Sequence, residues 1–353
     1  MAILPILPSL PLTGLLLALL PVLCFLGMLL YLESYKLVTQ RTVLMLVGLG
    51  ALQTVLSYFV TAGLLALGHF EFDTFTVFGS PLSEELIKAL AVIWLIRSHR
   101  IGFLVDAAIL GFATGAGFGT AENLYFLHTM PDASIALWIA RGFGTAIMHG
   151  GATALFAIVS MAMLERKSVF PGQVWLPGLL VAVLLHSGFN ELHRHPTLAL
   201  LMVLMLVPLL LHLAFKRGEK VVGDWLGRGF DADAEMLELI MSGDFTGSPA
   251  GSYLTSLKDR FKGLVVADLL CYLRLSTELT LRAKGVLLMR ENGFSVPIDA
   301  ETHARFVELK YLRGSIGKTG LLALQPMLHT SHSDLWQMFL DDPPARDEST
   351  AGN

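Results

Sequence analysis

The apolar positions of the chain fall into long runs separated by short polar loops. A helix that crosses the hydrocarbon core of a bilayer needs about 20 mostly apolar residues. Seven segments meet this requirement, although the third and the sixth are short and carry charge. They are residues 12–32, 42–66, 80–97, 102–127, 135–163, 174–192 and 196–215. The pattern therefore predicts an all-α fold, a polytopic transmembrane helix bundle with about seven spans.

Beyond residue 215 the pattern becomes amphipathic. Leucine, valine and phenylalanine recur at helical spacing from Tyr253 onward, with charged residues between them. Two more amphipathic stretches, about 231–242 and 301–313, flank this helix, and Gly243–Gly251 has the composition of a linker. We therefore expect a C-terminal cytoplasmic helical domain without a catalytic constellation, which is a candidate docking site for a cytosolic regulator.

Three parts follow from these two patterns. They are a transmembrane domain over residues 1–215, a helical regulatory or docking domain over 216–340, and a disordered tail over 341–353. The first span lacks a basic leading segment and a small-residue cleavage site, so we expect it to be retained.

Composition agrees with residence in a membrane. The chain is 54% hydrophobic and 15% charged, with a mean hydropathy of +0.63, which is too apolar for an ordinary soluble protein. The net charge is −4 and no block of Lys and Arg is long, so no nucleic-acid partner is expected. Cys24 and Cys271 are the two cysteines, which gives neither a disulfide framework nor a cysteine metal site.

The basic residues of the loops predict the orientation of the spans. One set of loops carries Lys36, Arg41, Arg97, Arg100, Arg166, Lys167, Lys216, Arg217 and Lys220. The alternate set carries Glu71, Asp73, Asp132 and Glu191, with Arg194 as its basic residue. Because basic loops stay in the cytoplasm, we expect the N-terminus outside and the C-terminal domain inside, in the inner (cytoplasmic) membrane of the cell.

Ionisable side chains recur inside four of the predicted spans. Each costs at least about 2.5–3.5 kcal/mol at the centre of an inserted helix, so such residues are usually functional. The candidates are Glu84, Glu85 and Lys88 in the third span, Glu122 in the fourth, Arg141 and His149 in the fifth, and His186 and Asn190 in the sixth. At a rise of 1.5 Å per residue they lie within roughly 16 Å of the outer face. Independent helices are thus expected to deliver carboxylates, imidazoles and an amide to one layer.

Spacing within the helices supports a common site. Glu84 and Lys88 are four residues apart, as are His186 and Asn190, so each pair shares a helix face. Lys88 is expected to be a counter-ion to the glutamates. Arg141 is expected to be either an ion partner or an anchor at the interface. Gly111, Gly115 and Gly119 form a small-residue face on which a neighbouring backbone can approach closely.

These motifs resemble the PrsW family of intramembrane proteases. The resemblance rests on four motifs in order over about residues 40–215, which are Glu84-Glu85-x-x-Lys88, Phe118-x-x-x-Glu122 with Asn123, His149, and His186-x-x-x-Asn190. They resemble more distantly the CAAX prenyl endopeptidase and bacteriocin-immunity superfamily, from which the chain departs by having Glu122 where a histidine would stand. The resemblance implies hydrolysis of a membrane-anchored protein, of the anti-sigma-factor class, on the extracytoplasmic side.

Two mechanisms are compatible with these residues. In the first, Glu84 activates a water as general base, assisted by His149 or Glu122, and His186 and Asn190 stabilise the oxyanion. In the second, His149, His186 and a glutamate such as Glu122 bind zinc and leave a position open for water. We favour the metal-free scheme, because an asparagine one turn after His186 suits an oxyanion site better than a zinc site.

Two other function classes remain open at this point. An ion- or solute-coupled membrane transporter also carries intramembrane glutamates and histidines. Such a protein usually shows repeats or broken helices near the midplane, whereas the inner halves of these spans are almost uniformly apolar. A catalytically silent membrane adaptor would not need the cluster. An intramembrane endopeptidase that uses a glutamate-activated water is therefore the favoured prediction.

Overall fold

The computed structural model describes residues 12–34, 37–68, 70–130, 132–164, 173–192, 195–294, 296–297 and 299–328. No strand occurs within these ranges, so the all-α prediction is confirmed. The chain divides into two compact units, Met1–Glu219 and Lys220–Asn353, which are described separately below. The segment 341–353, expected to be disordered, and the loop residues Lys36, Arg166, Lys167 and Arg194 lie outside the described ranges.

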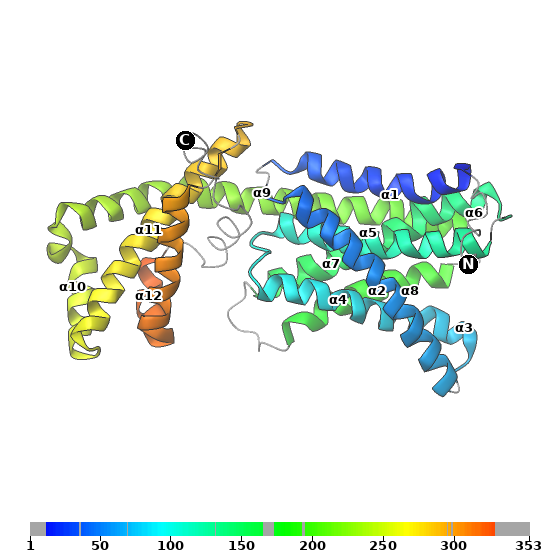
Figure 1. The fold of residues 1–353 in the computed structure, drawn as a ribbon, viewed down its shortest axis with the longest axis horizontal. Coiled ribbons are helices and arrows are strands. Elements are labelled where there is room, and N and C mark those ends of the chain that lie inside the picture. Colours follow the sequence, from blue (N-terminus) through cyan, green and yellow to red (C-terminus); the bar gives the residue numbers. More distant parts are fainter. Residues whose placement is uncertain are drawn as a thin grey trace, which may run out of the picture. The chain divides into compact units, whose positions relative to one another are not determined.

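The first unit is built from helices that mostly lie side by side (Figure 1). They are α1 (Leu12–Leu32), α2 (Gln40–Leu67), α3 (Phe72–Thr74), η1 (Phe75–Gly79), α4 (Ser80–Arg97), α5 (Leu104–Thr129), α6 (Ile135–Ile139), η2 (Ala140–Thr145), α7 (Ala146–Leu164), η3 (Gln173–Trp175), α8 (Leu176–Glu191) and the first part of α9 (Pro196–Ser242). In the described part of the chain, six helices are long and apolar enough to cross a membrane, which confirms the polytopic bundle.

The expected third span forms α4, an 18-residue helix that carries Glu84, Glu85, Lys88 and Arg97. It is not among the six helices, because it carries more charged side chains than an apolar membrane-spanning helix. The count of seven spans thus stays a prediction, since it depends on whether α4 crosses the bilayer.

Helix α5 is the centre of the first unit. It is buried along most of its length and packs against α7 on one side and α2 on another. Glycine makes the contact with α7 close: a methyl group at Gly115 would overlap the backbone oxygen of His149, and one at Gly119 would lie 2.9 Å from the Cα of Ala146. A methyl group at Gly111 would lie 2.8 Å from the Cα of Ala154. The glycine face expected from the sequence therefore packs directly on α7.

Near the cytoplasm-facing end predicted for α5, Asp106 caps the helix. Its Oδ2 accepts a hydrogen bond of 3.0 Å from the backbone N–H of Phe103, and the residue is fully buried. An acidic side chain at this position satisfies N–H groups that have no partner within the helix.

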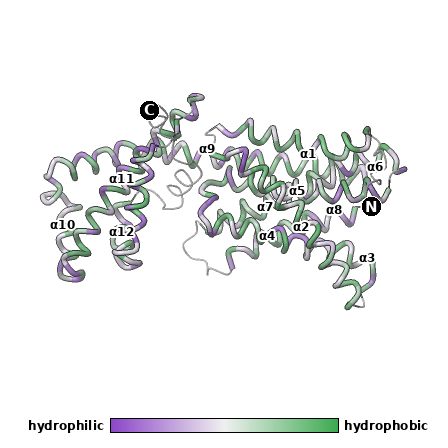
Figure 2. Tube along the Cα trace, viewed as in Figure 1, coloured by the Kyte–Doolittle hydropathy of each residue, from purple (hydrophilic) through white to green (hydrophobic). Residues whose placement is uncertain are grey.

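The second unit contains the rest of α9 and a set of further helices. These are η5 (Asp244–Gly247), α10 (Pro249–Ser256), η6 (Leu257–Asp259), α11 (Gly263–Glu291), α12 (Ala300–Leu324) and η7 (Gln325–Met327). Figure 2 shows hydrophilic patches along α11 and α12, whereas α1 and α2 are mainly hydrophobic. Lys284 and Asp233 form a buried ion pair of 2.8 Å within this unit.

Three details of the second unit differ from the sequence prediction. The last span and the amphipathic stretch 231–242 belong to one helix, α9, which continues through several glycines because no proline separates the two segments. The expected linker Gly243–Gly251 is helical from Pro249, where Ser248 accepts a hydrogen bond of 3.0 Å from Gly251. The helix predicted from Tyr253 onward is interrupted before Gly263 and then continues to Glu291.

Candidate functional site

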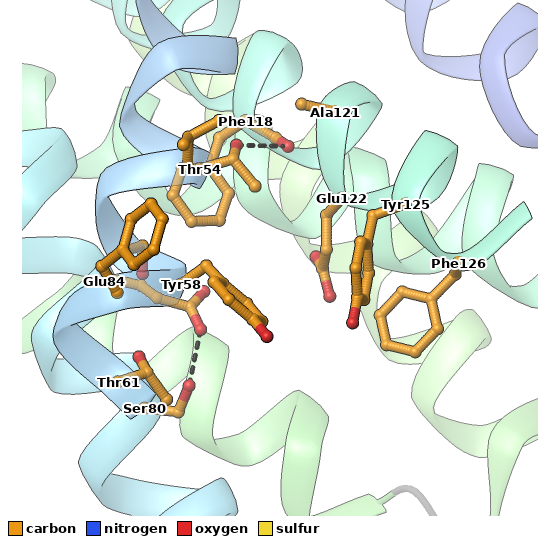
Figure 3. Close-up of a pocket in the computed structure, with 13 residues that line it drawn as sticks. Thr54, Tyr58, Thr61, Ser80, Glu84, Phe118, Ala121, Glu122, Tyr125 and Phe126 are labelled. Carbon is orange, nitrogen blue, oxygen red and sulfur yellow. Dashed lines mark hydrogen bonds between the residues drawn. The ribbon is translucent and has the colours of Figure 1, made fainter. Parts of the chain in front are cut away.

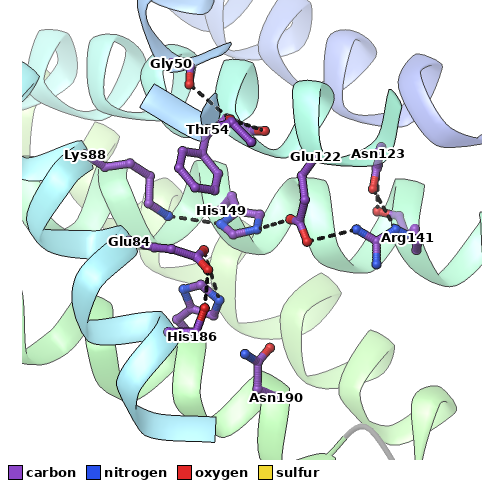
Figure 4. Close-up of polar contacts among 12 residues, drawn as sticks. Gly50, Thr54, Glu84, Lys88, Glu122, Asn123, Arg141, His149, His186 and Asn190 are labelled. Atoms are coloured by element: carbon purple, nitrogen blue, oxygen red, sulfur yellow. Dashed lines mark hydrogen bonds and ion pairs between the residues drawn. The ribbon is translucent and has the colours of Figure 1, made fainter. Parts of the chain in front are cut away.

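The structure brings together the polar residues of α4, α5, η2, α7 and α8 (Figure 4). All eight residues that the sequence singled out take part in one network or line the cavity next to it. They are Glu84, Glu85, Lys88, Glu122, Arg141, His149, His186 and Asn190.

His149 is the central member of the network. Its Nδ1 lies 3.0 Å from Nζ of Lys88, and its Nε2 lies 2.7 Å from Oε2 of Glu122. Lysine has only donors and a carboxylate only acceptors. Nδ1 therefore accepts from Lys88, and Nε2–H donates to Glu122. This assigns the neutral Nε2–H tautomer to His149.

His186 has a similar arrangement with the opposite nitrogen. Its Nδ1 lies 2.8 Å from Oε1 of Glu85, so Nδ1–H is the donor. Its Nε2 is turned towards Glu84, at 3.9 Å from Oε2. The two imidazole rings are nearly perpendicular, with their centroids 4.8 Å apart. Each histidine thus holds a carboxylate on one nitrogen and directs a lone pair from the other.

Lys88 and Arg141 supply the positive charge of the cluster. Lys88 is fully buried and donates at 2.5 Å to Oε1 of Glu85, a glutamate of its own helix. Arg141 lies 3.1 Å from Oε1 of Glu122 and donates through Nε to Asn123 at 3.0 Å. Its guanidinium also lies 3.8 Å from the ring centroid of Phe126. Arg141 is thus an ion partner within the cluster rather than a separate anchor.

The polypeptide geometry near the site is unusual at two places. Residues Phe75–Gly79 and Ala140–Thr145 form π-helical turns that lead directly into α4 and α7. Short π-helical segments shift the register of a helix and occur frequently at functional sites. Arg141 lies within the second of these turns and His149 lies in the helix that follows it, and both contact Glu122.

A cavity of about 410 Å³ lies beside the network. Glu84, Glu122, His149 and His186 line it together with Asn190. Asn190 donates a hydrogen bond of 3.0 Å to the backbone oxygen of Thr76. The residues that would carry chemistry and a space that a substrate group could enter are therefore adjacent.

Three of these residues could hold a metal ion. Glu84, His149 and His186 each offer a donor atom, and the three atoms lie within 4.8 Å of one another. Two imidazoles and a carboxylate are a frequent donor set for catalytic zinc. The sequence-based expectation named Glu122 as the carboxylate donor, whereas Glu122 here bonds to Arg141 and to the far nitrogen of His149.

The sequence reasoning did not select Ser80, and it named Asn123 as part of a motif without its partners. Ser80 donates to Oε1 of Glu84 at 2.6 Å, and Asn123 donates to the backbone oxygen of Ala18 at 2.9 Å. Ser80 precedes Glu84 by four residues, a spacing that could have identified it. The contact of Asn123 with α1 joins residues distant in sequence, which helical spacing could not reveal.

The comparison with protein families decides between the function classes that the sequence left open. Residues 39–213 match the profile of the PrsW family intramembrane metalloproteases. This part of the chain belongs to that family. The match covers α2 to α8 and most of the apolar part of α9, and so includes every residue of the cluster. Comparison with curated proteins and with solved structures gave no match.

The PrsW match makes the chain a multi-pass membrane protein with an intramembrane protease domain. It therefore supports peptidase activity over transport or a silent adaptor role. The family is described as metalloproteases, and the group formed by Glu84, His149 and His186 is chemically suited to a metal.

Proposed function

We propose that the chain hydrolyses a peptide bond of a membrane-anchored protein, near the extracytoplasmic face of the membrane, at the site formed by Glu84, His149 and His186. The observation that carries the proposal is the convergence of these three donors within 4.8 Å beside a cavity of about 410 Å³. The depth calculated for these residues from the outer ends of their spans supports the extracytoplasmic side.

Without a bound metal, Glu84 is the carboxylate best suited to act as general base on a water. Glu85 is almost fully buried and bonds to Lys88 and His186, so its charge is already compensated. Glu84 lines the cavity and, among the described residues, has one hydrogen-bond partner, Ser80. Oε2 of Glu84 lies 3.9 Å from Nε2 of His186, which lines the same cavity. A base needs this combination of access and fixed orientation.

The hydrogen bonds of the two histidines fit a metal ion. A histidine that binds a metal usually donates its other N–H to a carboxylate, which fixes the ring and its tautomer. Glu122 on His149 and Glu85 on His186 have this arrangement. These contacts favour a metal scheme over the metal-free scheme that we preferred from the sequence.

Glu84, His149 and His186 are the residues that would hold the ion. His149 would offer Nδ1, whose lone pair now accepts from Lys88, so the ammonium would have to move aside. When bound, a divalent ion would polarise the attacking water and the scissile carbonyl. Glu122 is then the remaining carboxylate on the cavity, where it bonds to Arg141 and His149.

The oxyanion donor follows from the tautomers. Neutral His186 carries its hydrogen on Nδ1, where it bonds to Glu85, so Nε2 has no hydrogen to donate. Asn190, one turn later on α8, presents an amide to the same cavity. We assign oxyanion stabilisation to Asn190 rather than to His186 and Asn190 together.

A reconstituted cleavage assay tests this function. The full-length protein in liposomes is incubated with a panel of single-span membrane peptides, before and after chelation and after addition of zinc. We expect cleavage in the outer third of the span, about one bound metal per chain, and activity that chelation removes and zinc restores. Full activity in metal-free protein would show that no metal is required and would favour Glu84 as the general base. Cleavage of no peptide under any condition would contradict the proposed function.

A further inference from the structure

A second cavity, of about 400 Å³, lies between α2 and α5 and reaches the candidate site (Figure 3). Ser80, Glu84, Glu122 and Phe126 line both this cavity and the one beside the histidines. The two spaces therefore meet at the pair of carboxylates. We call the second cavity the α2–α5 groove.

The groove exists because α2 diverges from α5. Near their crossing the backbones touch, since a methyl group at Gly50 would overlap the backbone oxygen of Thr114. One turn later the contact is between side chain and backbone, where the hydroxyl of Thr54 lies 3.0 Å from the oxygen of Phe118. Further on it is between rings only: the centroids of Tyr58 and Tyr125 are 5.9 Å apart.

The rest of α2 does not close the groove. All buried residues of this helix lie between Thr42 and Ser57, and Tyr58 and Phe59 are 57% and 66% exposed. In a membrane-embedded helix these exposed rings face the hydrocarbon layer. The groove thus leads from the lipid side of the protein, past Tyr58 and Tyr125, to Glu84 and Glu122.

The lining contains hydroxyl groups on one wall as well as aromatic rings. Thr54, Ser57 and Thr61 follow one another along the α2 side of the groove. Oγ1 of Thr61 is buried and has no hydrogen-bond partner within the described residues. A peptide must leave its helical conformation before its carbonyl can be attacked, and its freed N–H and C=O groups then need partners inside the membrane. The acyl chain of a lipid has no such groups and would need no hydrogen-bond partners in the groove.

We propose that the α2–α5 groove binds the apolar, locally unwound segment of the membrane-anchored substrate next to the bond to be cleaved, with Tyr58 and Tyr125 as its gate. This inference rests on the proposed function, because it takes the neighbouring cavity as the site of hydrolysis. Apolar side chains of the substrate pack on Tyr58, Tyr125 and Phe126, and its backbone bonds to the hydroxyls of Ser57 and Thr61. Tyr58, Thr61 and Tyr125 are positioning residues in this account.

Photo-crosslinking tests occupancy without requiring cleavage. The full-length protein carrying Glu84→Gln is reconstituted with a photoreactive phenylalanine at Tyr125 or, as a matched control, at Leu124. Leu124 is the adjacent exposed residue of α5 and lines neither cavity. The probe is a synthetic single-span peptide with a Gly-Pro break in its outer third, compared with an unbroken peptide of equal length.

We expect the broken peptide to label Tyr125 several-fold more than Leu124, and more than the unbroken peptide does. Equal labelling at both positions would overturn the proposal, and so would labelling of lipid at Tyr125 that excess peptide does not reduce. In the active protein, Tyr58→Ala and Thr61→Val should raise KM by up to about tenfold with a smaller change in kcat, because they remove contacts to the bound segment. Leu124→Ala should change neither.

The two readouts separate this inference from the proposed function. Selective labelling of Tyr125 without cleavage of any peptide by the wild-type protein would support the groove and contradict the hydrolysis. Cleavage with equal labelling at Tyr125 and Leu124, and with unchanged KM in the Tyr58 and Thr61 variants, would support the hydrolysis and overturn the groove.

Discussion

The ammonium of Lys88 lies 3.0 Å from Nδ1 of His149, on the nitrogen that an ion would use. The same ammonium donates to Glu85 at 2.5 Å. A buried cation therefore links the first motif of the chain to the central histidine. Its two contacts make Lys88 part of the structural framework of the site, since it neutralises Glu85 and orients His149.

Removal of this cation should destabilise the membrane domain. Lys88→Met leaves the carboxylate of Glu85 buried without its counter-ion, which typically costs about 3–5 kcal/mol. We expect a clear fall in the midpoint of thermal denaturation in detergent. Lys216→Met, at an exposed position of α9, is the control and should have little effect. Equal stability of the two variants would show that Lys88 does not compensate Glu85.

The close approach of α5 and α7 should tolerate no added methyl group. Gly115→Ala would place a Cβ against the backbone oxygen of His149 and so displace the histidine. We expect loss of cleavage and lower thermal stability. Gly48→Ala, on α2, meets nothing within 4 Å and should be neutral or slightly stabilising, since alanine favours a helix over glycine by about 1 kcal/mol. Unchanged cleavage by Gly115→Ala would contradict the packing described for His149.

The orientation of the membrane domain can be tested with reporter fusions. The excess of Lys and Arg in one set of loops predicts that a fusion after Lys220 is cytoplasmic. A fusion in the connection at residues 69–79, which is helical from Phe72 onward, should be extracytoplasmic. The opposite result at both positions would move the site to the cytoplasmic side and remove the support for an extracytoplasmic substrate.

The C-terminal unit offers a test that is independent of catalysis. Asp299 caps α12 by accepting a hydrogen bond of 2.7 Å from the backbone N–H of Thr302. Asp299→Ala should lower the free energy of opening of the first turn of α12 by about 1 kcal/mol. Amide hydrogen exchange of the full-length protein measures this change directly. Glu308→Ala, at an exposed position within α12, should leave the exchange of that turn unchanged, and equal effects would exclude a capping role.

Much of the site could be predicted because placing ionisable side chains inside a membrane costs free energy, so such residues are rare. Ionisable groups in apolar helices, such as Glu122 and His149, stand out against the surrounding composition. The glycines of α5 correctly indicated a close helix contact, whereas Lys88 bonds to Glu85 and not to Glu84, the glutamate that spacing by four residues had grouped with it.

The specific pairing of these groups could not be predicted. Which glutamate faces which histidine depends on helix rotations that side-chain packing sets, so Glu84 rather than Glu122 joins the two imidazoles. The π-helical turn at Ala140–Thr145 and the divergence of α2 also depend on tertiary packing. The expectation of a linker at Gly243–Gly251 missed the helix start at Pro249, although the Ser248 cap and the proline at the first helical position are local signals.

Cleavage of a single-span peptide by the reconstituted Glu84→Gln protein shows whether this carboxylate acts in hydrolysis. The matched control is Glu191→Gln, at an exposed position of α8 that lines neither cavity next to the site. We expect Glu191→Gln to cleave like the wild type, and Glu84→Gln to insert and fold normally but to lose at least about 100-fold in rate, as expected for loss of an acid–base or metal-binding group. Cleavage by Glu84→Gln at the wild-type rate would contradict this role of Glu84.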